Sequence, residues 1–350
     1  MPGDLIFSRE APMGQVGAVP VAVPVCLGQR TVLLRPDDER VDGRFLLYLL
    51  MAPQSQAWIN ANAAGSTVLH LNVADVRRIP VPFVPELDEQ RRIVDLLEDH
   101  LSRLDAAIGS LRAALRRANT MVMSSLAHQV GRGRRRGYMS TIGEQAEVIQ
   151  YGSGAKCGPS TDEDDVPVLR MGNVRDGALV WNSLKYLPSD HRDFPKLFLE
   201  PGDLLFNRTN SAELVGKSAV FDSDRTASFA SYLIRVRLRT GVLPEWANMV
   251  INSPVGREYV ASVVSQQVGQ ANVNGTKLKA FPLPVPPLEE QALRVSEHAV
   301  VVESRERLET ALGTAIAQEG GLRRSLLAAA FSGRLADDRG LFAVRGLVGA

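Results

Sequence analysis

The segment Pro2-Gly-Asp-Leu-Ile-Phe-Ser-Arg9 returns 199 residues later as Pro201-Gly-Asp-Leu-Leu-Phe-Asn-Arg208. Further matches keep the same order at spacings of 201 or 202 residues: Ile79-Pro-Val-Pro82 with Phe281-Pro-Leu-Pro284, and Leu87-Asp-Glu-Gln90 with Leu288-Glu-Glu-Gln291. The preserved order indicates an internal duplication. Because solenoid repeats span only about 20–50 residues, each copy must hold a whole domain.

The length of the chain does not accommodate two full copies. It has 350 residues, and residues 137–200 of the second copy have no counterpart before Met1. A half-domain would leave strand edges unpaired and its core open. Three explanations compete: a start codon assigned too far downstream, a split or frameshifted gene, and a genuine short form. We favour a truncated or mis-started chain.

Composition narrows the class of protein. With 40 Lys and Arg against 39 Asp and Glu, the formal net charge is +1, which argues against a nucleic-acid binder that relies on bulk charge but allows a local basic face. Cys26 and Cys157 are too far apart in sequence for a disulfide framework or a CxxC metal site. No signal peptide or bilayer-length apolar run is present. We therefore expect a cytoplasmic protein that does not bind membranes.

Each copy ends in a helical pattern of about 40 residues, or ~60 Å at a rise of ~1.5 Å per residue. Proline-rich segments at residues 80–85 and 282–287 should stop any strand or helix before each one starts. Apolar residues at steps of three and four predict a coiled-coil seam. The seam residues are Leu97, Leu101, Leu104, Ile108, Leu111 and Leu115 in the first helix, and Val295, Ala299 and Val302 in the second.

Short strand-like runs separated by turns precede each long helix, which predicts an α+β fold with two strand-rich α/β domains, the first partial. Within the second domain, helices are expected at about 245–251 and 256–266. The predicted boundaries are residues 1–85 for the partial first domain, 86–130 for the first long helix, 131–137 for a basic linker, 138–287 for the second domain, 288–332 for the second long helix and 333–350 for a tail.

The sequence offers no catalytic constellation. The five histidines lack metal-ligand spacing, and the phosphate-binding loop and nucleophile-elbow motifs are absent. No residue near Cys157 would depress its pKa, so a packed thiol is expected there. We therefore predict no metal, no cofactor in this chain and no enzymatic activity of its own.

Polar loop residues of the second domain are suited to reading DNA. Asn and Gln can pair with adenine and Arg or Lys with guanine in the major groove, and lysines can anchor phosphates. The alternative is that they are ordinary polar residues of surface loops with no role in binding. The candidates are Arg170, Asn173, Arg175, Arg208, Asn210, Lys217, Gln270, Asn272, Asn274, Lys277 and Lys279.

The chain resembles the specificity subunit of type I restriction–modification systems. The resemblance rests on Gly202-Asp-Leu-Leu-Phe-Asn-Arg-Thr-Asn-Ser211, on Phe281-Pro-Leu-Pro-Val-Pro-Pro-Leu-Glu-Glu-Gln291, and on the closing segment Ser325-Leu-Leu-Ala-Ala-Ala-Phe-Ser-Gly-Arg-Leu335. The resemblance is strong over residues 138–335 and good over residues 2–132. Compared with the family, the chain lacks the start of the first target recognition domain.

That resemblance implies a reader of a bipartite site in double-stranded DNA. Each target recognition domain would read one half-site, and the two helices would pair antiparallel and set the gap. They would also dock two modification subunits that methylate adenine with S-adenosylmethionine, joined by restriction (motor–nuclease) subunits where the system cleaves. The alternatives are a truncated scaffold that occupies modification subunits without reading a site, and the specificity half of a single-chain restriction–methylation enzyme.

Overall fold

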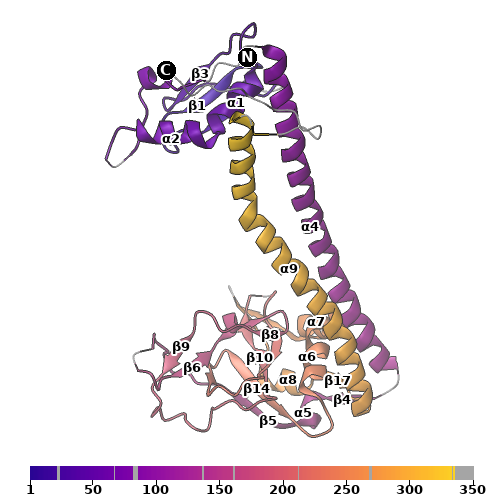
Figure 1. The fold of residues 1–350 in the computed structure, drawn as a ribbon. Helices are drawn as coiled ribbons and strands as arrows, with labels where there is room; N and C mark the ends of the chain where they lie inside the picture. The colour runs from indigo at the N-terminus through magenta and orange to yellow at the C-terminus, as the bar shows by residue number, and fades with distance from the viewer. Residues whose placement is uncertain are drawn as a thin grey trace. The chain divides into compact units, whose positions relative to one another are not determined.

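Two sheet-containing domains and two long helices make up the computed structural model, which describes residues 1–21, 24–66, 68–81, 86–135, 138–160, 162–211, 213–267, 270–332 and 334–335 (Figure 1). The chain divides into two units, one formed by Met1–Ala114 with Leu308–Ala350 and the other by Leu115–Arg307. Apart from residues 334 and 335, the expected tail after residue 332 lies outside the described residues.

The first unit is built around a three-stranded antiparallel sheet. Its central strand β1 (Leu5–Ser8) pairs with β2 (Val16–Ala18) and β3 (Thr31–Leu34). Because alternate strand residues point to opposite faces, Leu5 and Phe7 both enter the core, where they are 1% and 0% exposed.

Helices α1 (Gly43–Met51), α2 (Pro53–Ala61) and α3 (Val73–Val76) follow that sheet. The carboxylate of Asp42 caps α1 by accepting the backbone N–H groups of Arg44 and Phe45, which satisfies donors that a helix start otherwise leaves unpaired. Leu50 of α1 and Ile59 of α2 pack with Phe7 in one apolar cluster.

The second unit repeats this sheet with a fourth strand and adds smaller sheets. Its four-stranded antiparallel sheet has the order β12 (Ser218–Val220), β10 (Leu204–Asn207), β14 (Leu233–Leu238) and β5 (Ala146–Tyr151). Smaller sheets join β6 (Val166–Leu169) with β9 (Lys185–Leu187) and β13 (Ser228–Phe229), and β7 (Val174–Arg175) with β8 (Ala178–Leu179).

The sheets confirm the duplication residue by residue. Leu5 pairs with Ala18 and Leu34, and its counterpart Leu204 pairs with Val220 and Val236. Helices α6 (Pro244–Asn252), α7 (Pro254–Val263) and α8 (Gly275–Lys279) repeat α1 to α3. The α+β fold class is thereby confirmed.

Two local expectations were wrong. The helix expected to reach residue 266 ends at Val263, and the next residues form β15 (Ser265–Gln267), which pairs with β16 (Gln270–Asn272); β16 also pairs with β11 (Thr209–Asn210). Within the proline-rich segment, β17 (Pro282–Pro284) pairs with β4 (Met139–Thr141). A two-stranded ribbon leaves one side of each strand unpaired, so prolines can face that side without loss of a hydrogen bond.

The long helices are α4 (Leu87–Arg135) and α9 (Leu288–Phe331), and each contributes to both units. Helix α4 includes residues 131–135 of the stretch expected to be a linker, whereas residues 136 and 137 lie outside the described residues. In the first unit the early part of α4 packs on the late part of α9, as in the pair Leu97 and Leu327. In the second unit Gln129 of α4 bonds to Glu297 of α9, so the helices pair antiparallel.

Candidate nucleic-acid interface

A basic pocket of about 660 Å³ lies in the second unit. It forms where the turn after β6, the β11 loop and the start of β12 meet the residue before β14. Four of the residues predicted from the sequence line it, namely Arg170, Arg175, Asn210 and Lys217. Residues more than 40 positions apart in the chain thus meet around one hollow.

The cations of this pocket are held in place by local bonds. Arg170 donates to the carbonyl of Ser183 at 3.1 Å, and Arg175 Nε donates to the carbonyl of Gly172 at 3.2 Å. Lys217 Nζ lies 3.1 Å from the Asp176 carboxylate, which is itself mostly exposed. Among the described residues, Lys217 is the one cation of this lining with an ion-pair partner, so the lining keeps an excess of positive charge suited to an anion such as a phosphate.

The lining also contains three partly exposed apolar side chains, Met171, Leu214 and Tyr232, exposed by 38%, 40% and 44%. None of these three residues was predicted from the sequence as a site residue. Partly exposed large apolar side chains beside cations suit contact with base edges or a thymine methyl. The three residues come from separate loops that meet only in the folded protein. No motif in the sequence therefore pointed to them.

Asn173 does not belong to the binding surface that the sequence predicted. Its side chain is 3% exposed, and its Nδ2 donates to the carbonyls of Val180 at 2.9 Å and Asn182 at 3.0 Å. Its Oδ1 accepts the N–H of Arg170 at 3.0 Å. All its polar atoms therefore hold the pocket loop in shape, and none is left to read a base.

A second group of predicted residues surrounds Tyr151 of β5. The guanidinium of Arg208 lies 5.0 Å from the centroid of the Tyr151 ring and donates to Asn272 Oδ1 at 3.4 Å. Asn272 in turn donates to Thr209 Oγ1 at 2.9 Å. The hydroxyl of Tyr151 accepts the N–H of Gly275 at 2.8 Å. This network fixes one cation over an aromatic face.

The remaining candidates lie on or near α8. Asn274 caps this helix by accepting the N–H of Lys277 at 3.0 Å, and Lys277 Nζ donates to Ser265 Oγ at 2.6 Å. Lys279 is exposed in the last turn. Gln270 begins β16, but its side chain lies outside the described residues.

The predicted seam residues of α4 are all buried or half-buried, whereas one of the three predicted in α9 is exposed. Leu97, Leu101 and Ile108 are buried, and Leu104, Leu111 and Leu115 are half-buried. In α9, Val295 and Val302 are half-buried, but Ala299 is exposed.

The residues of α9 that face inward in the second unit are largely polar. Arg294 is 4% exposed and donates to Gln129 Oε1 at 3.3 Å, and His298 Nδ1 lies 3.1 Å from Ser125 Oγ. The apolar pattern of the sequence predicted Ala299 at the seam, and this prediction was wrong because Ala299 is exposed. The actual stripe passes through its neighbour His298.

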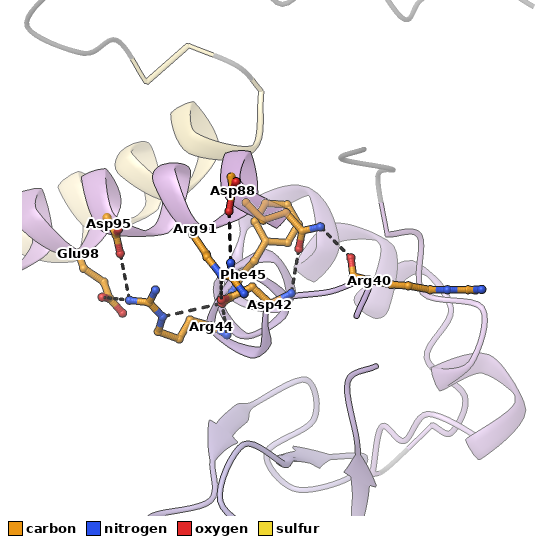
Figure 2. A network of polar contacts seen from close by, with 9 residues as sticks. Arg40, Asp42, Arg44, Phe45, Asp88, Arg91, Asp95 and Glu98 are labelled. Atoms are coloured by element: carbon orange, nitrogen blue, oxygen red, sulfur yellow. Dashed lines mark hydrogen bonds and ion pairs between the residues drawn. The ribbon is translucent and has the colours of Figure 1, made fainter. Parts of the chain in front are cut away.

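A buried glutamine joins each long helix to its domain. In the first unit, Gln90 Oε1 accepts the N–H of Asp42, and Gln90 Nε2 donates to the carbonyl of Arg40, both at 2.9 Å. Figure 2 shows the surrounding polar network, in which Arg44 of α1 reaches Asp95 and Glu98 of α4 at 3.1 and 2.9 Å. These contacts tie the start of α1 to α4.

Within the described residues, no group of three or more His, Cys, Asp or Glu side chains could hold a metal ion. Burial raises the pKa of Cys157, and the charge of Arg170 partly opposes this shift. The expectation that no nearby residue would lower this pKa was therefore wrong, although the net direction is upward. Among the described helices, none combines the length and the apolar character needed to cross a membrane.

A duplicated sheet-and-helix domain and a pair of long helices define a two-repeat α+β protein. Residues 2–112 match the family model of the type I restriction modification DNA specificity domain. The chain is 25% identical over 315 residues to the type I restriction enzyme EcoKI specificity subunit of Escherichia coli (strain K12), covering 87% of this chain and 68% of that protein. It is also 25% identical over 288 residues to the StySPI specificity subunit of Salmonella potsdam, covering 79% and 62%.

Solved structures share the fold. The HsdS subunit from Thermoanaerobacter tengcongensis superposes with a TM-score of 0.63 at 18% identity, covering 95% of this chain and 81% of that one. A second solved structure, described as the structural basis of complex assembly and conformational transition of the type I R-M system, contains a chain that superposes with a TM-score of 0.73 at 18% identity. The match covers 95% of this chain and 82% of that one. The chain is thus similar in sequence to type I restriction enzyme specificity subunits, and it spans about two thirds of the length of EcoKI and StySPI.

Proposed function

We propose that this protein is a non-catalytic, sequence-specific DNA-binding subunit of a type I restriction–modification complex. The observation that carries the proposal is the pocket of the second unit, where Arg170, Arg175 and Lys217 surround a hollow with Asn210 and Tyr232 at its wall. Cations there can bind phosphates, and the amide and apolar groups can contact base edges. The second domain then reads one half of a bipartite site in cytoplasmic DNA.

The partners follow from the same proposal. Methyltransferase subunits, which carry S-adenosylmethionine, dock on the chain and modify adenine, and motor–nuclease subunits join where the system cleaves. The paired helices α4 and α9 support a docking role because they form rigid, mostly polar rods. Since partner subunits contribute DNA affinity, the near-neutral charge of this chain is compatible with DNA binding.

The test is a map of methylated adenines in DNA exposed to the chain with its modification subunits. We expect one bipartite motif with the unsubstituted chain. Asn210→Ala should relax the preference at one position of one half-site, because a lost base contact costs about 1–3 kcal/mol of discrimination. Methylation without a sequence motif, or a motif indifferent to every pocket substitution, would contradict the proposal.

A further inference from the structure

One acidic side chain stands among the cations of the pocket in the second unit. Among the described residues that line it, Asp176 is the acid and Arg170, Arg175 and Lys217 are the cations. The Asp176 side chain is 76% exposed and lies 3.1 Å from the ammonium of Lys217, whose side chain is 25% exposed. Exposed ion pairs contribute little to stability, so the pocket does not need this carboxylate to hold together. Its exposure and its place instead suit contact with a ligand.

The backbone presents Asp176 at the tip of a hairpin. Asp176 and Gly177 form the two-residue turn between β7 and β8, in which Arg175 pairs with Ala178. Both turn residues have positive φ, 49° for Asp176 and 85° for Gly177, as a type I′ turn requires. Asp-Gly is a favoured sequence for this turn because Asp and Gly tolerate the left-handed region. The carboxylate is thus carried on a tight and defined turn.

Two asparagines of α6 fasten that turn to the rest of the pocket. Asn248 Nδ2 donates to the carbonyl of Gly177 at 2.7 Å, and Asn248 Oδ1 accepts the Ser218 hydroxyl at 2.8 Å. Asn252 Nδ2 donates to the Ser218 carbonyl at 3.1 Å, and its Oδ1 accepts the Ser218 N–H at 3.2 Å. Ser218 directly follows Lys217 in the chain. One set of bonds therefore fixes both the hairpin turn and the residue next to Lys217.

The chemistry of a carboxylate limits what it can contact on DNA. An ionised carboxylate only accepts hydrogen bonds, and it is repelled by the charge of phosphates. In the major groove the groups that can donate to it are the amines at cytosine N4 and adenine N6. Adenine places the acceptor N7 beside its amine, where it would repel the second carboxylate oxygen, whereas the cytosine ring has only a C–H group there. Cytosine is therefore the base that suits a carboxylate.

We propose that Asp176 is a specificity-determining residue that accepts a hydrogen bond from the N4 amine of one cytosine in the target half-site. The inference rests on the DNA-binding function proposed above. Lys217 donates to Oδ1 of Asp176, and a carboxylate has lone pairs on both oxygens, so Oδ2 can accept from a base. The ammonium of Lys217 also offsets the charge of the carboxylate, which allows an acidic side chain to approach DNA.

The test maps methylated adenines in duplex DNA exposed to the full chain with its modification subunits. In Asp176→Gly the acceptor is gone, and Gly-Gly still suits a type I′ turn, so the hairpin should persist. We expect one position of one half-site to lose its preference for cytosine by about tenfold, while the rest of the motif stays the same.

Asp176→Asn replaces the carboxylate by an amide and keeps the turn, because Asn-Gly is also favoured there. Asparagine pairs bidentately with N6 and N7 of adenine, so the same position should shift from cytosine towards adenine. Asp224→Asn is the matched control. Asp224 is exposed and lies outside the described lining of the pocket, and its substitution should leave the motif unchanged.

Two outcomes would overturn the proposal. If Asp176 serves only as the counter-charge of Lys217, both substitutions of Asp176 will change methylation at all sites alike and keep the cytosine. A motif of the unsubstituted chain that contains no C·G pair would also refute a cytosine contact. In either case the bipartite motif remains, so the proposed DNA-binding function survives. Methylation without any motif would instead refute that function and, with it, this inference.

Discussion

Gln291 and Leu243 are joined by a hydrogen bond in which the N–H of Leu243 donates to Gln291 Oε1 at 2.9 Å. Gln291 Nε2 donates to the carbonyls of Gly241 at 2.9 Å and Pro286 at 2.7 Å, and the side chain is 0% exposed. In the first repeat Gln90 bonds to Asp42 and Arg40, the counterparts of Leu243 and Gly241. One glutamine in each copy thus attaches the first turn of a long helix to the loop before α6 or α1.

We predict that Gln291→Leu destabilises the second unit by about 2–4 kcal/mol, because three backbone groups lose their partner and one of them, the carbonyl of Pro286, is buried. Glu289→Gln is the matched control, since Glu289 is exposed two residues before Gln291 and should change stability by less than about 0.5 kcal/mol. Urea unfolding of the full chain measures both. Equal midpoints for the two variants would show that the glutamine does not hold the helix to the domain.

Lys217→Gln should weaken DNA binding across sequences and lower the slope of log affinity against log salt by about one, the effect of one lost phosphate contact. Arg239→Gln is the control. Arg239 follows β14, whereas Tyr232 of the pocket precedes that strand, and this control should leave the slope unchanged. Fluorescence anisotropy at several salt concentrations gives both slopes, and a pocket role for Lys217 fails if the two variants behave alike.

Leu97→Ala should destabilise the first unit by about 2–5 kcal/mol, because Leu97 is 0% exposed against Leu327 and a cavity would remain. Leu104→Ala removes the same atoms from a half-buried seam position and should cost less. Differential scanning calorimetry of the full chain resolves the comparison. A larger loss at Leu104 would contradict the seam described here.

His298 should make the second unit less stable in acid. Burial lowers the pKa of His298, so the folded state favours the neutral ring, and Arg294, Glu297 and Ser125 lie near it on the two helices. The stabilising contribution is complete above the unfolded pKa of about 6.5 and is lost as the pH falls below it. Chemical unfolding between pH 8 and 5 should show this loss, and His298→Gln should flatten it; an equal slope in the variant would exclude His298 as the cause.

The sequence alone determined the duplication, the α+β class, the two long helices and the family resemblance. These features are carried by local patterns. Pro2-Gly-Asp and Pro201-Gly-Asp mark equivalent turns before β1 and β10, and apolar residues at helical spacing predict α4 whatever else the chain does. Periodicity and repeated motifs are properties of neighbouring residues, so they can be read without knowing the contacts between distant ones.

Tertiary structure alone decided which predicted residues act together. Arg170, Asn210 and Lys217 meet in one pocket, whereas Asn173, of the same residue class, is buried in bonds to backbone carbonyls. In α9 the inward stripe passes through His298 and not Ala299 because packing on α4 selects the face. Exposure and partnership depend on segments far apart in the sequence, and only the folded arrangement brings those segments into contact.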